Sequence, residues 1–218
     1  MAQRSKSPTL VLLVRHGTTP TTGAVLPGRA PGLHLADTGV AQAAIAAERI
    51  GALAEAKGRT VEAVYASPLE RTRETAAPIA RAVGKRVRTD ANLLECDFGT
   101  WTGKRLATLR KRPEWTTVQQ APSRFRFPGG ESFAEMQVRI CGGIDRLVAA
   151  HPGGTIVAVS HADPIKAAVA QALGTPLDLF QRIVISPCSI TAILFGAGAP
   201  LVLATNSTGD DLTALVPP

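Results

Sequence analysis

Short apolar runs alternate along the chain with longer segments in which apolar residues recur every three or four positions. Three of these runs, Leu10–Val14, Val61–Ala66 and Thr155–Val159, are rich in β-branched residues, which is typical of parallel strands covered on both faces. Two later runs, Ile190–Phe195 and Leu201–Ala204, are separated by Gly-Ala-Gly-Ala-Pro and predict a hairpin. The pattern therefore predicts strands at five places.

Helical periodicity fills the intervals between the expected strands. The expected helices are Gly39–Ala56, Glu70–Val83, Phe133–Leu147 and Pro164–Leu173. In the first helix, Ile45, Ile50 and Leu53 are expected on the buried side. In the third, Gly142 and Gly143 each cost about 1 kcal/mol relative to Ala, so close packing is expected there. Strands that alternate with helices indicate an α/β sheet.

Residues 97–130 break this alternation. They contain two Trp, three Pro and several basic residues, and they are expected to form a loop and helical insertion over the rim at one edge of the sheet. The sequence has no repeat, low-complexity tract or composition shift that would mark a linker. Residues 1–218 are therefore expected to form a single domain.

Composition limits the partners that such a domain can have. Hydrophobic residues make up 45% of the chain and charged residues 19%, which favours a folded core over disorder. The formal net charge is +7, and it favours a small phosphorylated partner. The basic residues are scattered, so neither nucleic acid nor a membrane is expected as a partner. The sequence does not indicate an oligomeric state.

Cysteine usage and the first residues bear on the compartment. The chain has three Cys, an odd number without the spacing of a disulfide framework. The apolar run before Arg15 is only about six residues long, shorter than a secretory signal requires. A soluble, cytoplasmic protein is expected.

Three of the expected strands end in residues that can carry chemistry. The first runs into Arg15 and His16, the second into Ser67, and the third into Ser160 and His161. Ligands of open α/β sheets bind outside the carboxyl ends of the strands, so these side chains are expected to meet at one rim. The positive charge of Arg15 disfavours protonation of His16. A neutral imidazole can act as a ligand, a base or a nucleophile.

Helix-start signals follow two of these strands. The segment Ser67–Glu70 has the form of a capping box, with Ser at the N-cap and Glu at the third helical position. Arg71 would then lie in the first turn, where a nearby anion explains a cation better than surface pairing with Glu74 does. Asp163 before Pro164 is expected to cap the next helix, and the alternative is a catalytic acid.

No stretch predicts a cofactor. The segment 99–105 imitates a phosphate-binding loop, but it has three residues between its glycines and no Ser or Thr after Lys104. No Gly-rich segment lies between a strand and a helix as in a dinucleotide fingerprint, and no spacing of His, Cys and Asp indicates a metal site. The sequence therefore predicts no cofactor and no metal.

Four motifs occur together and in order along the chain. They are Arg15-His16-Gly17, Ser67-Pro68-Leu69-x-Arg71-Thr72-x-x-Thr75-Ala76, Leu94-Glu95-x-x-Phe98-Gly99-x-Trp101-x-Gly103 and Ser160-His161. They resemble the histidine phosphatase superfamily, which includes the cofactor-dependent phosphoglycerate mutases, and the resemblance covers about residues 9 to 205. Within the family, the chain looks most like actinobacterial proteins described as probable phosphomutases. The resemblance implies a three-layer α/β/α fold with a central, mostly parallel sheet.

The resemblance also implies a role for each matched residue. His16 would be the nucleophile that accepts the phosphoryl group, and Glu95 would donate a proton to the leaving oxygen. Arg15, Arg71 and His161 would hold the phosphoryl oxygens, with His161 counted among the catalytic residues. The chemistry agrees, because guanidinium groups stabilise the charge that spreads over phosphoryl oxygens.

The chain departs from the mutases of this family at several positions. Thr22 and Asp163 stand where mutases carry Asn, and an adjacent Arg pair is split into Arg124 and Arg126. A mutase must retain a bisphosphate, which takes extra cationic contacts, so the sequence favours a metal-independent phosphomonoester phosphatase that acts through a phosphohistidine. The alternatives are a phosphoglycerate-type mutase and a non-catalytic phosphate-binding or adaptor protein. The candidates for substrate contact are Thr18, Thr22, Arg29, Arg124 and Arg126.

Overall fold

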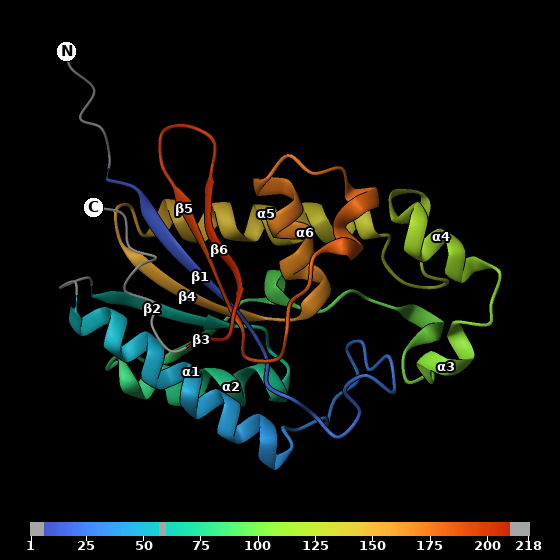
Figure 1. Ribbon diagram of the computed structural model, residues 1–218, viewed down its shortest axis with the longest axis horizontal. Helices are drawn as coiled ribbons and strands as arrows, with labels where there is room; N and C mark the ends of the chain where they lie inside the picture. The colour runs from blue at the N-terminus through green and yellow to red at the C-terminus, as the bar shows by residue number, and fades with distance from the viewer. Residues whose placement is uncertain (1–6, 57–59, 210–218) are drawn as a thin grey trace.

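Six strands form one sheet at the centre of the protein, in the order β3-β2-β4-β1-β5-β6 (Figure 1). The computed structural model describes residues 7–56 and 60–209. The strands are β1 (Thr9–Arg15), β2 (Val61–Ala66), β3 (Val87–Thr89), β4 (Thr155–Ser160), β5 (Ile190–Phe195) and β6 (Leu201–Ser207). β1 to β4 run parallel, while β5 is antiparallel to β1 and to β6. The expected mostly parallel sheet and the late hairpin are confirmed.

Helices cover both faces of the sheet, which confirms the three-layer arrangement (Figure 1). Alternate β1 side chains explain why both faces need cover, because Leu10 and Leu12 belong to one core cluster and Val11 and Leu13 to the other. The α-helices are α1 (Asp37–Ala56), α2 (Glu70–Ala82), α3 (Leu106–Leu109), α4 (Glu114–Gln120), α5 (Phe133–Ala150) and α6 (Ala162–Ala172). Short 3-10 helices cover Ala91–Leu93, Gly99–Trp101, Pro122–Arg124 and Leu177–Arg182. In Figure 1, α1 and α2 lie on one face, and α5 and α6 on the other.

One burial position and one strand differ from the sequence expectation. Ile45 is 52% exposed, whereas Ile50 and Leu53 are buried as expected. The buried face of α1 combines Ile50 and Leu53 with small residues such as Ala43. Ile45 lies outside this face. β3 was not expected, since three residues are too few to show a periodic pattern.

The paired glycines of α5 have different surroundings. A Cβ atom on Gly143 would lie 2.6 Å from the Cβ of Asn92, closer than real Cβ atoms come. A Cβ on Gly142 would meet only Arg146 Nη1, at 3.7 Å. The expected close packing is therefore confirmed at Gly143 alone, where α5 contacts the 3-10 helix that contains Asn92.

Aromatic side chains attach the segment 97–130 to α5. The ring of Phe127 lies 5.4 Å from that of Trp101, 4.9 Å from Phe125 and 5.2 Å from Phe133 at the start of α5. Edge-to-face pairs of this kind add to the stabilisation from buried area. In Figure 1, α3 and α4 of this segment lie beyond the carboxyl ends of the parallel strands. No helix within residues 7–56 and 60–209 is long and apolar enough to cross a membrane.

Candidate active site

The ends of three parallel strands bring both candidate histidines together. Arg15, the last residue of β1, is paired in register with Ser160, the last residue of β4. The chain then continues into His16 and His161, whose ring centroids are 5.2 Å apart. Both rings are buried. The sheet register thus places two imidazoles at one point of the rim.

The hydrogen bond of His16 determines which ring nitrogen carries the lone pair. Its Nδ1 lies 2.8 Å from the carbonyl oxygen of Gly17. A carbonyl can only accept, so Nδ1–H donates and Nε2 keeps its lone pair. Burial above all, and then the charges of Arg71 and Arg15, lower the pKa of His16 to about 3. The neutral imidazole expected from the sequence is confirmed, although burial is a larger cause than Arg15.

His161 is neutral as well, and both of its nitrogens have partners. Arg71 Nη2, which can only donate, lies 3.2 Å from Nδ1, so Nε2 carries the proton and donates to Ser67 Oγ at 2.9 Å. Burial and the charge of Arg71 place the pKa of His161 well below its ordinary value. In this arrangement His161 orients Arg71, and it can hold a phosphate oxygen only by exchanging one of these bonds.

The expected capping box at Ser67 is wrong. α2 begins at Glu70, its N-cap is Leu69, and no side chain caps it. Ser67 is fully buried and its hydroxyl is bonded to His161. The Ser67 Oγ that a local cap would use is hydrogen-bonded to His161 at the end of β4.

Two guanidinium groups next to His16 have buried N–H donors without an acceptor. Arg71 Nη2 donates to the carbonyl of Gly28 at 2.8 Å, and Arg15 Nη1 donates to that of Ile185 at 2.7 Å. Within the described part of the chain, Nε of Arg15 and both Nε and Nη1 of Arg71 find no hydrogen-bond partner. A buried unpaired donor costs about 1–3 kcal/mol. An anion bound beside His16 would supply the missing acceptors.

Glu95 is a buried carboxyl group whose environment favours the protonated form. Burial, and next the negative charge of Asp163, raise the pKa of Glu95 to about 7, against the opposing effects of Arg71, the Cys96 N–H and Arg15. Its Oε1 accepts from the Cys96 N–H at 3.0 Å. A carboxyl with a pKa near 7 can both give and take a proton at neutral pH.

The backbone that carries Glu95 is held by arginine. Arg139 of α5 donates to the carbonyl oxygens of Asn92 at 2.8 Å, Leu94 at 2.9 Å and Glu95 at 3.2 Å. Arg29 Nε donates to the same Glu95 carbonyl at 2.8 Å. Arg139 was not expected from the sequence, because nothing in a helical periodicity marks one Arg as the support of a distant loop.

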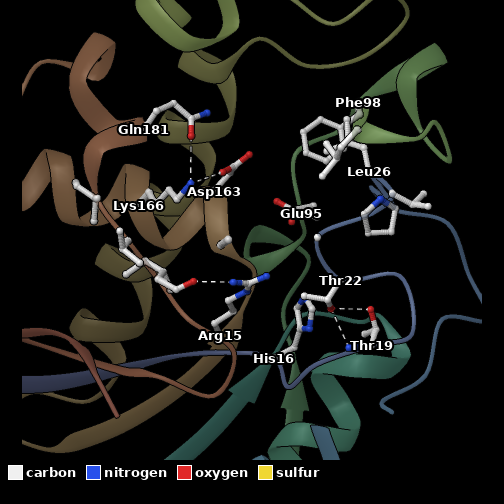
Figure 2. Close-up of a pocket in the computed structure, with 18 residues that line it drawn as sticks. Arg15, His16, Thr19, Thr22, Leu26, Glu95, Phe98, Asp163, Lys166 and Gln181 are labelled. Atoms are coloured by element: carbon white, nitrogen blue, oxygen red, sulfur yellow. Dashed lines mark hydrogen bonds and ion pairs between the residues drawn. The ribbon is translucent and has the colours of Figure 1, made fainter. Parts of the chain in front are cut away.

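A cavity of about 390 Å³ opens beside His16 (Figure 2). Its charged and polar lining consists of Arg15, His16, Thr19, Thr22, Glu95, Asp163, Lys166 and Gln181. Its apolar lining includes Val25, Leu26, Pro27, Phe98, Leu106, Ile183, Val184 and Ile185. The guanidinium of Arg71 and the ring of His161 are buried and are absent from this lining.

Comparison with known proteins agrees with this geometry. The family model of the histidine phosphatase superfamily (branch 1) matches residues 11–208. The chain belongs to the histidine phosphatase superfamily. The match begins within β1 and extends past the end of β6, and it includes every site residue described above.

Individual members of the superfamily are similar over most of this chain. A bifunctional protein of Mycobacterium tuberculosis is 36% identical over 207 residues, which is 93% of this chain and 55% of that protein. The chain thus spans about half the length of these mycobacterial relatives. Phosphoserine phosphatase 1 of Hydrogenobacter thermophilus is 30% identical over 203 residues, covering 91% of this chain and 92% of that protein. A phosphoserine phosphatase mutant of Entamoeba histolytica, solved with phosphoserine, has a TM-score of 0.81 and 26% identity, covering 93% of this chain and 98% of that chain.

Several expected substrate-contact residues of this superfamily member lie outside the cavity lining. Arg126 is exposed and pairs with Glu135, and Arg124 is also exposed. Arg29 forms an ion pair with Glu131 at 2.8 Å and supports the Glu95 backbone. These three arginines are absent from the cavity lining of the described residues, and their contact with substrate stays a prediction.

Among the threonines that follow His16, the structure selects different residues from the sequence. Thr22, a candidate for substrate contact, lines the cavity, and so does Thr19, which the sequence did not single out. The two hydroxyl oxygens lie 3.0 Å apart. Thr18 is absent from the lining, and its N–H donates to Gln42 Oε1 of α1 at 2.9 Å. The Thr18 backbone is therefore tied to α1.

The expected helix cap at Asp163 is also wrong. α6 begins at Ala162 with His161 as its N-cap, so Asp163 lies inside the first turn. Its carboxylate pairs with Lys166 at 3.3 Å and lines the cavity. The strand runs straight into the helix, which starts two residues earlier than the Asp-Pro signal indicated, and Pro164 is tolerated because first-turn N–H groups need no helical partner.

Gly17 serves the packing of the loop after β1. A Cβ atom there would lie 2.6 Å from the carbonyl oxygen of Gly39, near the start of α1. A Cβ on Gly39 would in turn lie 2.1 Å from the carbonyl oxygen of Thr18. The absence of side chains at both positions lets the loop that leaves β1 cross the helix at backbone distance.

Proposed function

We propose that the chain is a phosphomonoester phosphatase that acts through a phosphohistidine on His16. The observation that supports it best is the pairing of a neutral His16, with its lone pair on Nε2, with the buried unpaired N–H donors of Arg15 and Arg71. A phosphoryl group placed there would meet a nucleophile and the acceptor-seeking donors at once. Guanidinium groups fit the charge on transferring phosphoryl oxygens.

The proposed reaction has two steps. In the first, His16 Nε2 forms a bond to phosphorus, the ester P–O bond breaks, and Glu95 gives its proton to the leaving oxygen. In the second, water attacks phosphorus while Glu95 takes a proton from it, and the P–N bond breaks. The products are an alcohol, phosphate and a neutral His16, and splitting the displacement replaces one difficult step by two easier ones.

The lining of the cavity favours hydrolysis over a mutase reaction. A phosphoglycerate-type mutase must hold a bisphosphate, so it needs cations for a second phosphate. Arg124 and Arg126 lie outside the lining, and Lys166 is paired with Asp163. Interconversion of 3-phosphoglycerate and its isomer in the presence of a bisphosphate primer, without phosphate release, would overturn this choice.

We further propose that residues 97–130 act as one wall of the substrate site. Phe98 and Leu106 of this segment line the cavity. The proposed partner is a small phosphorylated molecule of the cytoplasm, and three unpaired cysteines support a reducing compartment.

The test is phosphate release from a panel of phosphomonoesters, including p-nitrophenyl phosphate. His16→Ala is expected to lower kcat by about 10³-fold or more, because loss of the nucleophile removes the covalent route. His34→Ala is the matched control, since His34 is exposed, pairs with Glu74 and lies away from the cavity. That variant should keep wild-type activity.

Trapping of the intermediate tests the chemistry itself. Wild-type protein quenched during turnover should carry a phosphoryl group that is labile in acid, and His16→Ala should carry none. Undiminished hydrolysis by His16→Ala would contradict the mechanism.

A further inference from the structure

The cavity extends well beyond the place where a phosphoryl group would bind. Its volume of about 390 Å³ falls in the range of pockets that enclose whole small molecules. The proposed phosphate site uses Arg15 and His16, at one end of the lining. The remaining lining must therefore contact the leaving group of the substrate.

Three polar side chains from two elements form a bonded group in this remaining part. Lys166 Nζ of α6 donates to Asp163 Oδ1 at 3.3 Å and to Gln181 Oε1 at 3.1 Å. The side chains of Lys166 and Asp163 are only 17% and 18% exposed. Figure 2 shows this group apart from His16 and across the cavity from Leu26 and Phe98. We call it the Lys166 group.

Within the Lys166 group, the negative charge of Asp163 compensates the positive charge of Lys166, and this affects which ligands can bind. Among the described residues that line the cavity, Lys166 and Arg15 are the two with permanently cationic side chains, and Arg15 belongs to the proposed phosphate site. The charge of Lys166 is shared with Asp163, so a carboxylate on the leaving group would meet no free cation and would face the Asp163 charge. Two negative charges held close together in a confined site repel each other, so binding of a carboxylate there is unfavourable.

The same group can still bind uncharged polar atoms. An ammonium has three N–H donors, and two of those on Lys166 are used within the group, which leaves one among the described contacts. The Asp163 carboxylate and the Gln181 amide add further acceptors and donors. Residues 25–27 and 183–185 supply apolar surface to the same cavity. A hydroxyl-bearing leaving group with an apolar face fits both surfaces.

We propose that the Lys166 group determines substrate specificity by selecting phosphomonoesters whose leaving group is uncharged and carries hydroxyl groups. This inference rests on the proposed phosphatase function, because it concerns the leaving group at that site. Asp163 acts here as the neutralising partner of Lys166. Removal of its charge should convert the cavity into one that accepts a carboxylate.

Two substrates that differ at one group test this selection. In 3-phosphoglycerate a carboxylate replaces the hydroxymethyl group of glycerol 3-phosphate, and both are compared by kcat/KM or, for a slow substrate, by their inhibition constants against p-nitrophenyl phosphate. Wild-type protein should prefer glycerol 3-phosphate by about tenfold, and Asp163→Asn should remove this preference, mainly through KM, as expected for one charged hydrogen bond. A ratio of two substrates cancels any common effect of the substitution on Glu95.

A second substitution serves as the internal control. Lys166→Gln in the Asp163→Asn background should cancel the gain on 3-phosphoglycerate, because the cation that the first substitution released is gone. A wild-type preference for 3-phosphoglycerate or for O-phosphoserine, an unchanged ratio in Asp163→Asn, or no binding of either compound would each overturn the proposal.

The phosphatase function and the charge selection by the Lys166 group are tested by separate measurements. Absence of phosphate release from p-nitrophenyl phosphate by wild-type protein contradicts the phosphatase function. In that event calorimetric titration of the wild-type and Asp163→Asn proteins with the same two compounds still measures the charge selection of the Lys166 group.

Discussion

At the residue scale, the site depends on which protons its buried groups hold. Burial keeps His16 and His161 neutral, since it lowers the pKa of each. Burial acts in the opposite direction on Glu95, raising its pKa to about 7, because it disfavours the charged form of either kind of group. One physical cause thus leaves the imidazoles with a free lone pair and favours a protonated Glu95 carboxyl.

The pH dependence of kcat should report the protonation of Glu95. If Glu95 donates the proton to the leaving oxygen, kcat falls as the pH rises through its pKa, which is about 7 before substrate adds its own negative charge. Asp163→Asn removes a charge that raises this pKa, so the alkaline fall should move to lower pH. A kcat profile for the hydrolysis of p-nitrophenyl phosphate measures the shift.

Glu95→Gln is the control for this profile. An amide has no proton to titrate, so the variant should lose both most of its activity and the alkaline fall. If Asp163→Asn left the fall in place or moved it to higher pH, Asp163 would not be acting on Glu95 through its charge.

At the scale of elements, helix α5 supports the loop that carries Glu95. Arg139 donates to three carbonyl oxygens of residues 92–95, and Gly143, one turn further along α5, lets Asn92 approach. Ser160 Oγ, at the end of β4, donates to the carbonyl of Leu93 at 2.8 Å. A helix and a strand end therefore hold the loop that carries Glu95, although neither adjoins it in the sequence.

Gly143→Ala should disturb this loop, whereas Gly142→Ala should not. The added Cβ at position 143 would lie 2.6 Å from Asn92 Cβ, so backbone must shift, and overpacking of this kind costs about 1–3 kcal/mol. At position 142 the added Cβ has room, and replacing Gly within a helix gains up to about 1 kcal/mol. Chemical denaturation of both variants measures the difference in the free energy of unfolding.

Activity separates the two glycine variants as well. Movement of Asn92 is transmitted along the backbone towards Glu95, so kcat of Gly143→Ala should fall while that of Gly142→Ala stays at the wild-type level. Equal stability and equal kcat in the two variants would show that the contact between Gly143 and Asn92 does not constrain the loop.

At the scale of the whole molecule, one carboxylate joins segments that are far apart in the chain. Glu131 forms ion pairs with Arg139 and Arg29, both at 2.8 Å, and accepts from the Asp97 N–H at 3.0 Å. Burial alone would raise the pKa of Glu131, yet the hydrogen bonds from Arg139 and from Asp97 outweigh it and lower the pKa. Since Arg29 and Arg139 also hold the Glu95 backbone, the same cluster links global stability to the site.

Glu131→Gln should lower the free energy of unfolding by about 1–3 kcal/mol, since it leaves two partly buried guanidiniums without their common counter-charge. A folded pKa below the ordinary 4.5 of a glutamate means that this stabilisation is complete above pH 4.5 and is lost as the pH falls through the folded pKa. Denaturation curves at neutral and acidic pH measure both effects.

Glu135→Gln is the matched control for the ion-pair cluster. Glu135 is exposed, pairs with Arg126 and closes the capping box of α5 with Ser132, and Gln can fill the same place in a capping box. This variant should unfold close to the wild type. An equal decrease in the free energy of unfolding in both variants would mean that the ion pairs of Glu131 contribute no more to stability than an exposed ion pair does.

The sequence by itself determined the sheet, the helices on its faces and the rim that collects Arg15, His16 and His161. These features follow from apolar periodicity and from residues next to strand ends, which a linear pattern displays directly. The resemblance to the superfamily added Glu95, which no local pattern marks. The membership of the chain in the superfamily is confirmed.

Only the tertiary structure decided what the polar residues around this centre do. Ser67 and Asp163 have the sequence signals of helix caps, but contacts with His161 and Lys166 engage their side chains instead. The sequence did not indicate that Arg29 donates to the Glu95 carbonyl. A side-chain hydrogen bond goes to the best partner in space, and for these residues that partner comes from a segment that local sequence does not specify.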